Sequence, residues 1–292
     1  MRSEKEIFQL ILDFAQTNER IRAVVLNGSR ANLNAKKDIF QDYDIIYFVN
    51  QIEFFTDDHS WIDIFGERLI LQMPDLMTLS GYQNDATVSF AYLMLFKDKN
   101  RIDLTLVPVE QIREAFVLES LSVLLLDKDK VFSNLPSPDE SDYLIEKPGE
   151  KEFSDTCNEF WWVSTYVAKG LWRGEITYVK EILENPVRKM FMKIIEWQIG
   201  IRTNFSVSFG KSGKNLKQYA DPELYNKILS TYPDSKVENI WKSLFLMTDI
   251  FNESAKEIGK HFGFRYNSME SLNILNYLKD VEVLSSSKEK KL

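Results

Sequence analysis

The spacing of apolar residues predicts a helix followed by a sheet in the first half of the chain. Ser3 and Glu6 form a capping-box pair, and apolar residues three or four apart follow them, as in an amphipathic helix. Short runs rich in β-branched and aromatic residues predict strands at 21–26, 43–49, 89–96 and 101–107. Polar residues 97–100 join the last two strands, which predicts an antiparallel hairpin that Pro108 ends.

The second half has a helical pattern. We expect helices over 109–126, 151–173, 175–202, 214–230 and 236–262, with a break at Pro186 and a frayed polar end over 285–292. Residues 133–150 are rich in proline and acidic side chains and mark a boundary. The pattern therefore predicts an α/β protein, with an N-terminal mixed-sheet domain over 1–135 and a helical C-terminal domain over 136–292.

Composition narrows the function classes. The net charge is -8, which argues against a nucleic-acid partner and suits a small cationic ligand. Cys157 is the only cysteine, and His59 and His261 are the only histidines, so an intrachain disulfide and a zinc site are excluded. Acidic residues near the N-terminus exclude a signal peptide, and no run of about 18 apolar residues occurs. We expect a cytoplasmic protein with no membrane contact and no obligate protein partner.

Two aspartates at the start of an expected strand are the sharpest chemical feature. Asp42 and Asp44 follow Gly28-Ser29 after twelve residues. Residues i and i+2 of a strand point to one face, so the two carboxylates project together. Near a core they repel each other unless a cation lies between them, and Mg²⁺ is the natural cation for carboxylate and phosphate oxygens.

A third aspartate completes the pattern. Asp103 alternates with apolar neighbours in the strand at 101–107. If that strand lies beside the one at 43–49, three carboxylates converge, as a two-metal phosphoryl-transfer site requires. Gly28 allows a tight turn, and the nearby amides and the Ser29 hydroxyl can bind phosphate oxygens. Asp-x-Asp alone is usually a surface loop or a helix cap, but the combination across three strands favours the metal site.

This combination resembles the nucleotidyltransferase superfamily and, more closely, the streptomycin-type aminoglycoside 6-adenylyltransferases of Gram-positive bacteria. The resemblance covers the chain to about residue 280, and Asn27 departs from it where some relatives have Glu. Its most characteristic stretches are Phe40–Asp44, Ile102–Leu106, Leu125–Asp129 and Asn158–Leu171.

The resemblance implies an enzyme that transfers AMP from ATP to an aminoglycoside hydroxyl, releases pyrophosphate and confers antibiotic resistance. It implies Mg²⁺, with two ions, as the cofactor. The proton acceptor is left open between Asp103 and Glu159. Another small-molecule acceptor such as a lincosamide, an RNA end, and a non-catalytic antitoxin-like module remain as alternatives. The acidic net charge counts against RNA, and the intact aspartates count against a module that only binds.

The expected helix at 151–173 carries an acidic and aromatic stripe that includes Glu159 and Trp162. Such a stripe suits a polycationic aminosugar, although a core Trp162 beside a solvated acidic helix start explains the spacing equally well. The resemblance favours drug binding by Glu159 and Trp162. Lys211 and Lys214 follow a glycine but do not form a phosphate-binding P-loop. A solvated basic face explains them, whereas the resemblance implies that they bind the nucleotide triphosphate.

Overall fold

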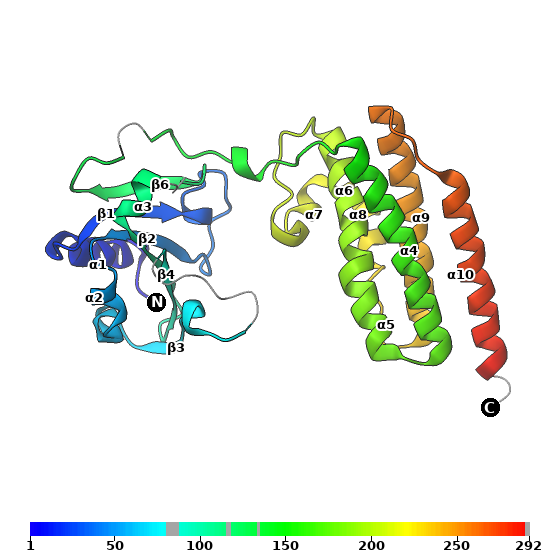
Figure 1. Ribbon diagram of the computed structural model, residues 1–292, viewed down its shortest axis with the longest axis horizontal. Helices are drawn as coiled ribbons and strands as arrows, with labels where there is room; N and C mark the ends of the chain where they lie inside the picture. Colours follow the sequence, from blue (N-terminus) through cyan, green and yellow to red (C-terminus); the bar gives the residue numbers. More distant parts are fainter. Residues whose placement is uncertain (80–87, 115–117, 133–134, 290–292) are drawn as a thin grey trace. The chain divides into compact units, whose positions relative to one another are not determined.

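The protein consists of two compact units, Met1–Asp142 and Tyr143–Leu292, and each is considered by itself. The computed structural model describes residues 1–79, 88–114, 118–132 and 135–289 (Figure 1). The division between the units falls within the proline-rich segment, of which residues 133–134 lie outside the described part. None of the described helices is long and apolar enough to cross a membrane.

The first unit is a six-stranded mixed sheet with α1 (Glu4–Thr17) packed against it (Figure 1). The capping box of Ser3 and Glu6 is present, as predicted. The sheet order is β3-β4-β5-β2-β1-β6, and among the described strands β2 and β5 are parallel while the other neighbours are antiparallel. The strands are β1 (Ile21–Asn27), β2 (Tyr43–Val49), β3 (Arg68–Gln72), β4 (Phe90–Phe96), β5 (Arg101–Pro108) and β6 (Ser122–Asp127). The predicted mixed sheet and the hairpin of β4 and β5 are confirmed.

Short helical segments lie between these strands or follow the last of them. They are Gly28–Arg30, α2 (Glu53–Thr56), His59–Phe65, Pro74–Leu76, α3 (Val109–Glu114) and Ser141–Tyr143.

The prediction of one helix over 109–126 is wrong. Helix α3 covers only its beginning, residues 115–117 lie outside the described part, and β6 covers its end. The apolar run Val123–Leu126 fits a helix or a strand equally well by spacing. This run forms a strand because it hydrogen-bonds to the edge of β1, where Ala23 to Asn27 pair with Asp127 to Ser122. Strand β3 was not predicted.

The two faces of the sheet differ. On one face Ile45 and Tyr47 pack with α1 in a large core. On the other face Ile46 and Phe48 form a smaller core with residues of β1 and β5. Asp44 shares this second face by alternation along β2, so it lies next to a core rather than on an open surface.

The second unit is a helical bundle in which α4, α6, α9 and α10 run alongside one another (Figure 1). Phe160 of α4 stacks on Phe251 of α9 with ring centroids 3.7 Å apart. The helices are α4 (Glu150–Arg173), α5 (Ile176–Ile182), α6 (Arg188–Arg202), α7 (Leu216–Tyr219), α8 (Pro222–Leu229), α9 (Val237–Phe262) and α10 (Ser268–Glu289). At Pro186 the chain does not break: a π-helical turn, Leu183–Val187, joins α5 to α6 and the backbone stays helical through it.

Two further predictions in this unit need correction. The helix expected at 214–230 is two short helices, α7 and α8. The frayed end expected at 285–292 is helical as far as Glu289, and residues 290–292 lie outside the described part. Helix α10 is stabilised because Leu278 and Val281 are buried against the bundle. The polar residues around them hide this contact from an analysis of apolar spacing.

Candidate active site

Two of the three predicted aspartates are direct neighbours in the sheet. Asp44 of β2 pairs with Asp103 of β5 in the parallel ladder, so both side chains leave the same face. Asp42 stands just before β2, two residues from Asp44. The structure therefore brings the three carboxylates to one end of the β2–β5 pair.

Arg101 lies among these carboxylates, and sequence reasoning missed it. Its guanidinium donates two hydrogen bonds to Asp103, from Nε to Oδ1 at 2.8 Å and from an Nη to Oδ2 at 2.6 Å. Its Nε is also 3.7 Å from a carboxylate oxygen of Asp42. The signal was present in the sequence, because residues i and i+2 of the expected strand share a face, which places Arg101 beside Asp103.

The electrostatics of the group reflect crowding of like charges. Burial, followed by repulsion from Asp103 and Asp42, raises the pKa of Asp44 to about 6. Burial also raises the pKa of Asp42, although the positive charge of Arg101 opposes this. The aspartates thus lie where an additional cation would be favourable.

The turn after β1 packs tightly against Asp44. Gly28 has φ +72°, and a Cβ at this position would stand 2.4 Å from Oδ2 of Asp44. Ser29 follows in the same turn, Gly28–Arg30. Arg30 fastens the turn to the segment before β2, because it donates to the carbonyl oxygens of Asp42 at 3.0 Å and Gln41 at 2.8 Å. The close approach explains why a glycine stands here.

The donor set suits magnesium chemically, since it consists of carboxylate oxygens that repel one another. Within the described residues, however, no group of three or more His, Cys, Asp or Glu side chains is arranged to hold a metal ion. The Arg101 guanidinium instead contacts Asp42 and Asp103. Metal binding by Asp42, Asp44 and Asp103 stays a prediction.

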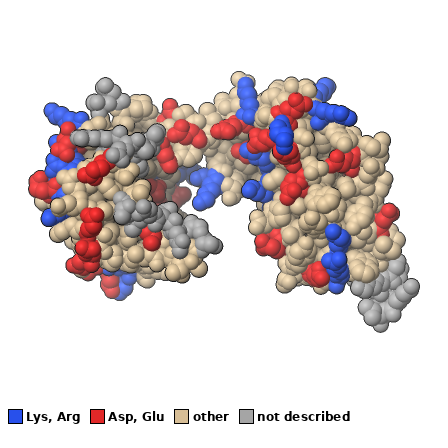
Figure 2. Space-filling view, in the orientation of Figure 1, with Lys and Arg blue, Asp and Glu red and all other residues tan. Residues whose placement is uncertain are grey.

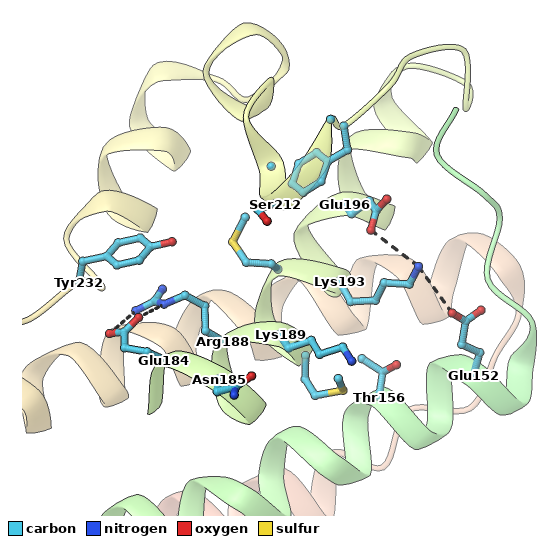
Figure 3. A pocket seen from close by; sticks show the side chains of 15 residues that line it. Glu152, Thr156, Glu184, Asn185, Arg188, Lys189, Lys193, Glu196, Ser212 and Tyr232 are labelled. Atoms are coloured by element: carbon cyan, nitrogen blue, oxygen red, sulfur yellow. Dashed lines mark hydrogen bonds and ion pairs between the residues drawn. The ribbon is translucent and has the colours of Figure 1, made fainter. Parts of the chain in front are cut away.

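The helical unit contains a cavity of about 660 Å³ whose charged residues come mainly from α4 and α6 (Figure 3). In Figure 3, Lys193 lies between Glu152 and Glu196 and forms an ion pair with each, at 3.6 and 3.7 Å. Arg188, the first residue of α6, forms an ion pair with Glu184 of the preceding π-helical turn and donates to the carbonyl oxygen of Thr231 at 2.7 Å. These paired charges make a polar wall that the sequence analysis did not identify.

Comparison with known proteins adds to this geometry. Residues 1–281 match the family described as streptomycin adenylyltransferase. The chain belongs to this family. An aminoglycoside 6-adenylyltransferase of Campylobacter jejuni is 44% identical, with 95% of each chain covered, and one of Bacillus subtilis is 39% identical, with 91% and 93% covered. A crystal structure of an aminoglycoside 6-adenyltransferase from Bacillus subtilis has 35% identity and a TM-score of 0.48, with 97% of this chain and 99% of that chain covered.

In this member of the streptomycin adenylyltransferase family, the predicted lysines lie at the rim of the helical unit's cavity. Lys211 and Lys214 are exposed and belong to a turn at 210–214. Gly210, Ser212 and Gly213 of the same turn line the cavity. The structure thus brings the two lysines together, next to a cavity that neither of them lines.

The predicted drug-binding residues of this family member lie on the outside of α4. Trp162 is 58% exposed and donates from its indole to the hydroxyl of Tyr166 at 2.7 Å, so it is not a core residue. Glu159 is exposed as well. Glu152, two turns before Glu159 on the same helix, lines the cavity, whereas Glu159 and Trp162 are not among its lining residues. Drug binding by these two residues remains a prediction.

Charge is mixed on the surface of this family member. Figure 2 shows acidic and basic side chains interspersed over the described part of the face that it draws. A nucleic-acid backbone is usually met by a continuous basic stripe. The absence of a nucleic-acid partner stays a prediction.

Proposed function

We propose that the protein transfers AMP from ATP to a hydroxyl of a streptomycin-like aminoglycoside and thereby confers resistance to the drug. Family membership and the two relatives described as aminoglycoside 6-adenylyltransferases support this proposal. The structural observation that carries it is the pairing of Asp44 with Asp103, with the Gly28 turn packed against Asp44. ATP as co-substrate also supports a cytoplasmic location.

The chemistry follows from the carboxylate group. The hydroxyl oxygen of the drug attacks the α-phosphorus of ATP, the bond to the β-phosphate oxygen breaks, and pyrophosphate leaves. The hydroxyl proton passes to a carboxylate, for which Asp103 is the first candidate and Glu159 the second. Magnesium held by Asp42, Asp44 and Asp103 would neutralise phosphate charge and lower the pKa of the attacking hydroxyl.

Other residues are proposed to hold the substrates. The Gly28-Ser29 turn offers backbone amides and a hydroxyl to the phosphates. Lys211 and Lys214 are exposed cations beside a cavity, and they suit the triphosphate as point charges. Glu159 and Trp162 offer a carboxylate and an exposed indole, which together suit a cationic sugar.

Pyrophosphate release tests the proposal. The purified protein is incubated with ATP and Mg²⁺, with streptomycin, with a lincosamide or with no acceptor, and Asp103→Asn is run in parallel. We expect release that depends on streptomycin and falls by roughly 100-fold or more in the variant, because a group that stabilises transition-state charge is lost.

The other outcomes separate the alternatives. Release only with the lincosamide would assign a different drug class. Absence of release with every acceptor would favour a non-catalytic module. Turnover of Asp103→Asn close to that of the wild type would refute the three-carboxylate site.

A further inference from the structure

Arg101 is placed so that it can exchange with a metal ion. It is the first residue of β5, and its guanidinium contacts Asp103 through both carboxylate oxygens and Asp42 through Nε. A bidentate pair of this kind takes up a lone pair on each carboxylate oxygen of Asp103, and its positive charge repels a cation. Arg101 and a metal ion bound by Asp42 and Asp103 therefore compete in this arrangement.

The Arg101 side chain also has an alternative position, in a neighbouring apolar cavity. Arg101 is 44% exposed, so packing does not fix it against the aspartates. It lines a cavity of about 720 Å³ whose other lining residues, apart from Gln72, are apolar, among them Leu93 and Leu95 of β4. The aliphatic stem of an arginine packs well on such a surface while its head stays in water.

The register of the sheet connects the two positions. Leu95 pairs with Arg101 and Leu93 pairs with Asp103 across the β4–β5 ladder. The apolar cavity and the carboxylates thus meet at Arg101. A change of side-chain rotamer at this one residue, without movement of the backbone, moves the positive charge away from Asp42 and Asp103.

We infer that Arg101 is an internal counter-ion, which neutralises Asp42 and Asp103 until a divalent cation displaces it toward the apolar cavity. This makes Arg101 a positioning residue that sets the metal affinity of the site. The inference rests on the proposed function in one respect, because it requires that Asp42 and Asp103 bind a divalent cation.

Manganese binding to the full-length protein tests the inference without measuring activity. Free Mn²⁺ is titrated by electron paramagnetic resonance at low salt for the wild type, Arg101→Gln, Arg101→Lys and Arg22→Gln. Arg22 is the matched control, because it also makes a bidentate pair, with Asp129, but near the opposite end of β1 from Gly28.

We expect Arg101→Gln to bind Mn²⁺ about tenfold more tightly than the wild type, which corresponds to about 1.4 kcal/mol. Arg101→Lys keeps the positive charge but cannot form the bidentate pair with Asp103. Its Mn²⁺ affinity should therefore fall between those of the wild type and Arg101→Gln. In EDTA, Arg101→Gln should melt at a lower temperature than the wild type, and Mn²⁺ should remove the difference. Arg22→Gln should bind Mn²⁺ as the wild type does.

If the wild type binds Mn²⁺ and Arg101→Gln binds it no more tightly, the counter-ion inference is overturned and the metal site remains. Equal affinities in the wild type and Arg101→Lys would overturn it even if Arg101→Gln does not fold. Failure of the wild type and both Arg101 variants to bind Mn²⁺ would overturn the metal site together with the inference.

Discussion

Replacing Gly28 with alanine is the most direct test of how the turn after β1 shapes the carboxylate group. The new Cβ would stand 2.4 Å from Oδ2 and 3.2 Å from Cγ of Asp44, far inside ordinary contact distance. It would also have to adopt φ +72°, which L side chains rarely do. The substitution therefore combines backbone strain with displacement of one carboxylate.

The two contributions have separate magnitudes. A non-glycine residue in the left-handed region costs about 1–2 kcal/mol. Forcing an extra methyl group into a packed site costs about 1–3 kcal/mol more. Gly28→Ala should therefore lower the free energy of unfolding of the sheet unit by about 2–5 kcal/mol. Turnover should fall by roughly 100-fold, because a shift of about 1 Å in a catalytic group has an effect of that size.

A double-mutant cycle with Asp44→Ala separates strain from clash in urea unfolding. In the Asp44→Ala background the clash is absent, so Gly28→Ala should lower the free energy of unfolding by the strain alone, about 1–2 kcal/mol. Gly174→Ala is the matched control for strain, because Gly174 has φ +77° and a Cβ there would meet nothing within 4 Å. Two results together would refute this reasoning: Gly28→Ala lowers the free energy of unfolding equally in the wild type and in Asp44→Ala, and the single variant Gly28→Ala turns over at nearly the wild-type rate.

Three further predictions concern charge. The pKa of Asp44 is raised from 3.8 to about 6, so its ionisation removes stability as the pH rises from about 4 to 6. Asp44→Asn should therefore raise the melting temperature of the metal-free protein at pH 7.5 and flatten its pH dependence; unchanged melting curves would contradict this. Lys211→Ala or Lys214→Ala should weaken ATP binding in calorimetry about tenfold or more, whereas Lys217→Ala should not. Glu159→Gln should weaken streptomycin binding by roughly 10- to 150-fold at low salt with ATP affinity unchanged, and equal drug affinity would place the drug elsewhere.

Local sequence signals predicted most of the fold. Strand β2 has the predicted bounds, and α1 begins at the predicted capping box, because period and caps are properties of neighbouring residues. Strand β6 and helix α10 were missed because their conformations depend on distant partners, the edge of β1 and the side of α4. Spacing along the chain does not carry that information.

The candidate site divides in the same way. The pairing of Asp44 with Asp103 could be anticipated, because each is a charged residue between apolar neighbours in its strand. The contact of Arg101 with Asp42 and the ion pair of Lys193 with Glu152 could not be anticipated, because they depend on packing between elements. Sequence gives the residue types of such a site, whereas folding decides which charges neutralise one another.

The parallel ladder between β2 and β5 also has a kinetic consequence. Parallel strands cannot be joined by a tight turn, and here β3, β4 and the segments around them separate Asp44 from Asp103 along the chain. Closing that loop is slow compared with forming a helix such as α4, whose contacts are largely local. During refolding the helical signal should therefore recover before the two aspartates become neighbours, so a chain that already looks native by circular dichroism can still be catalytically incompetent.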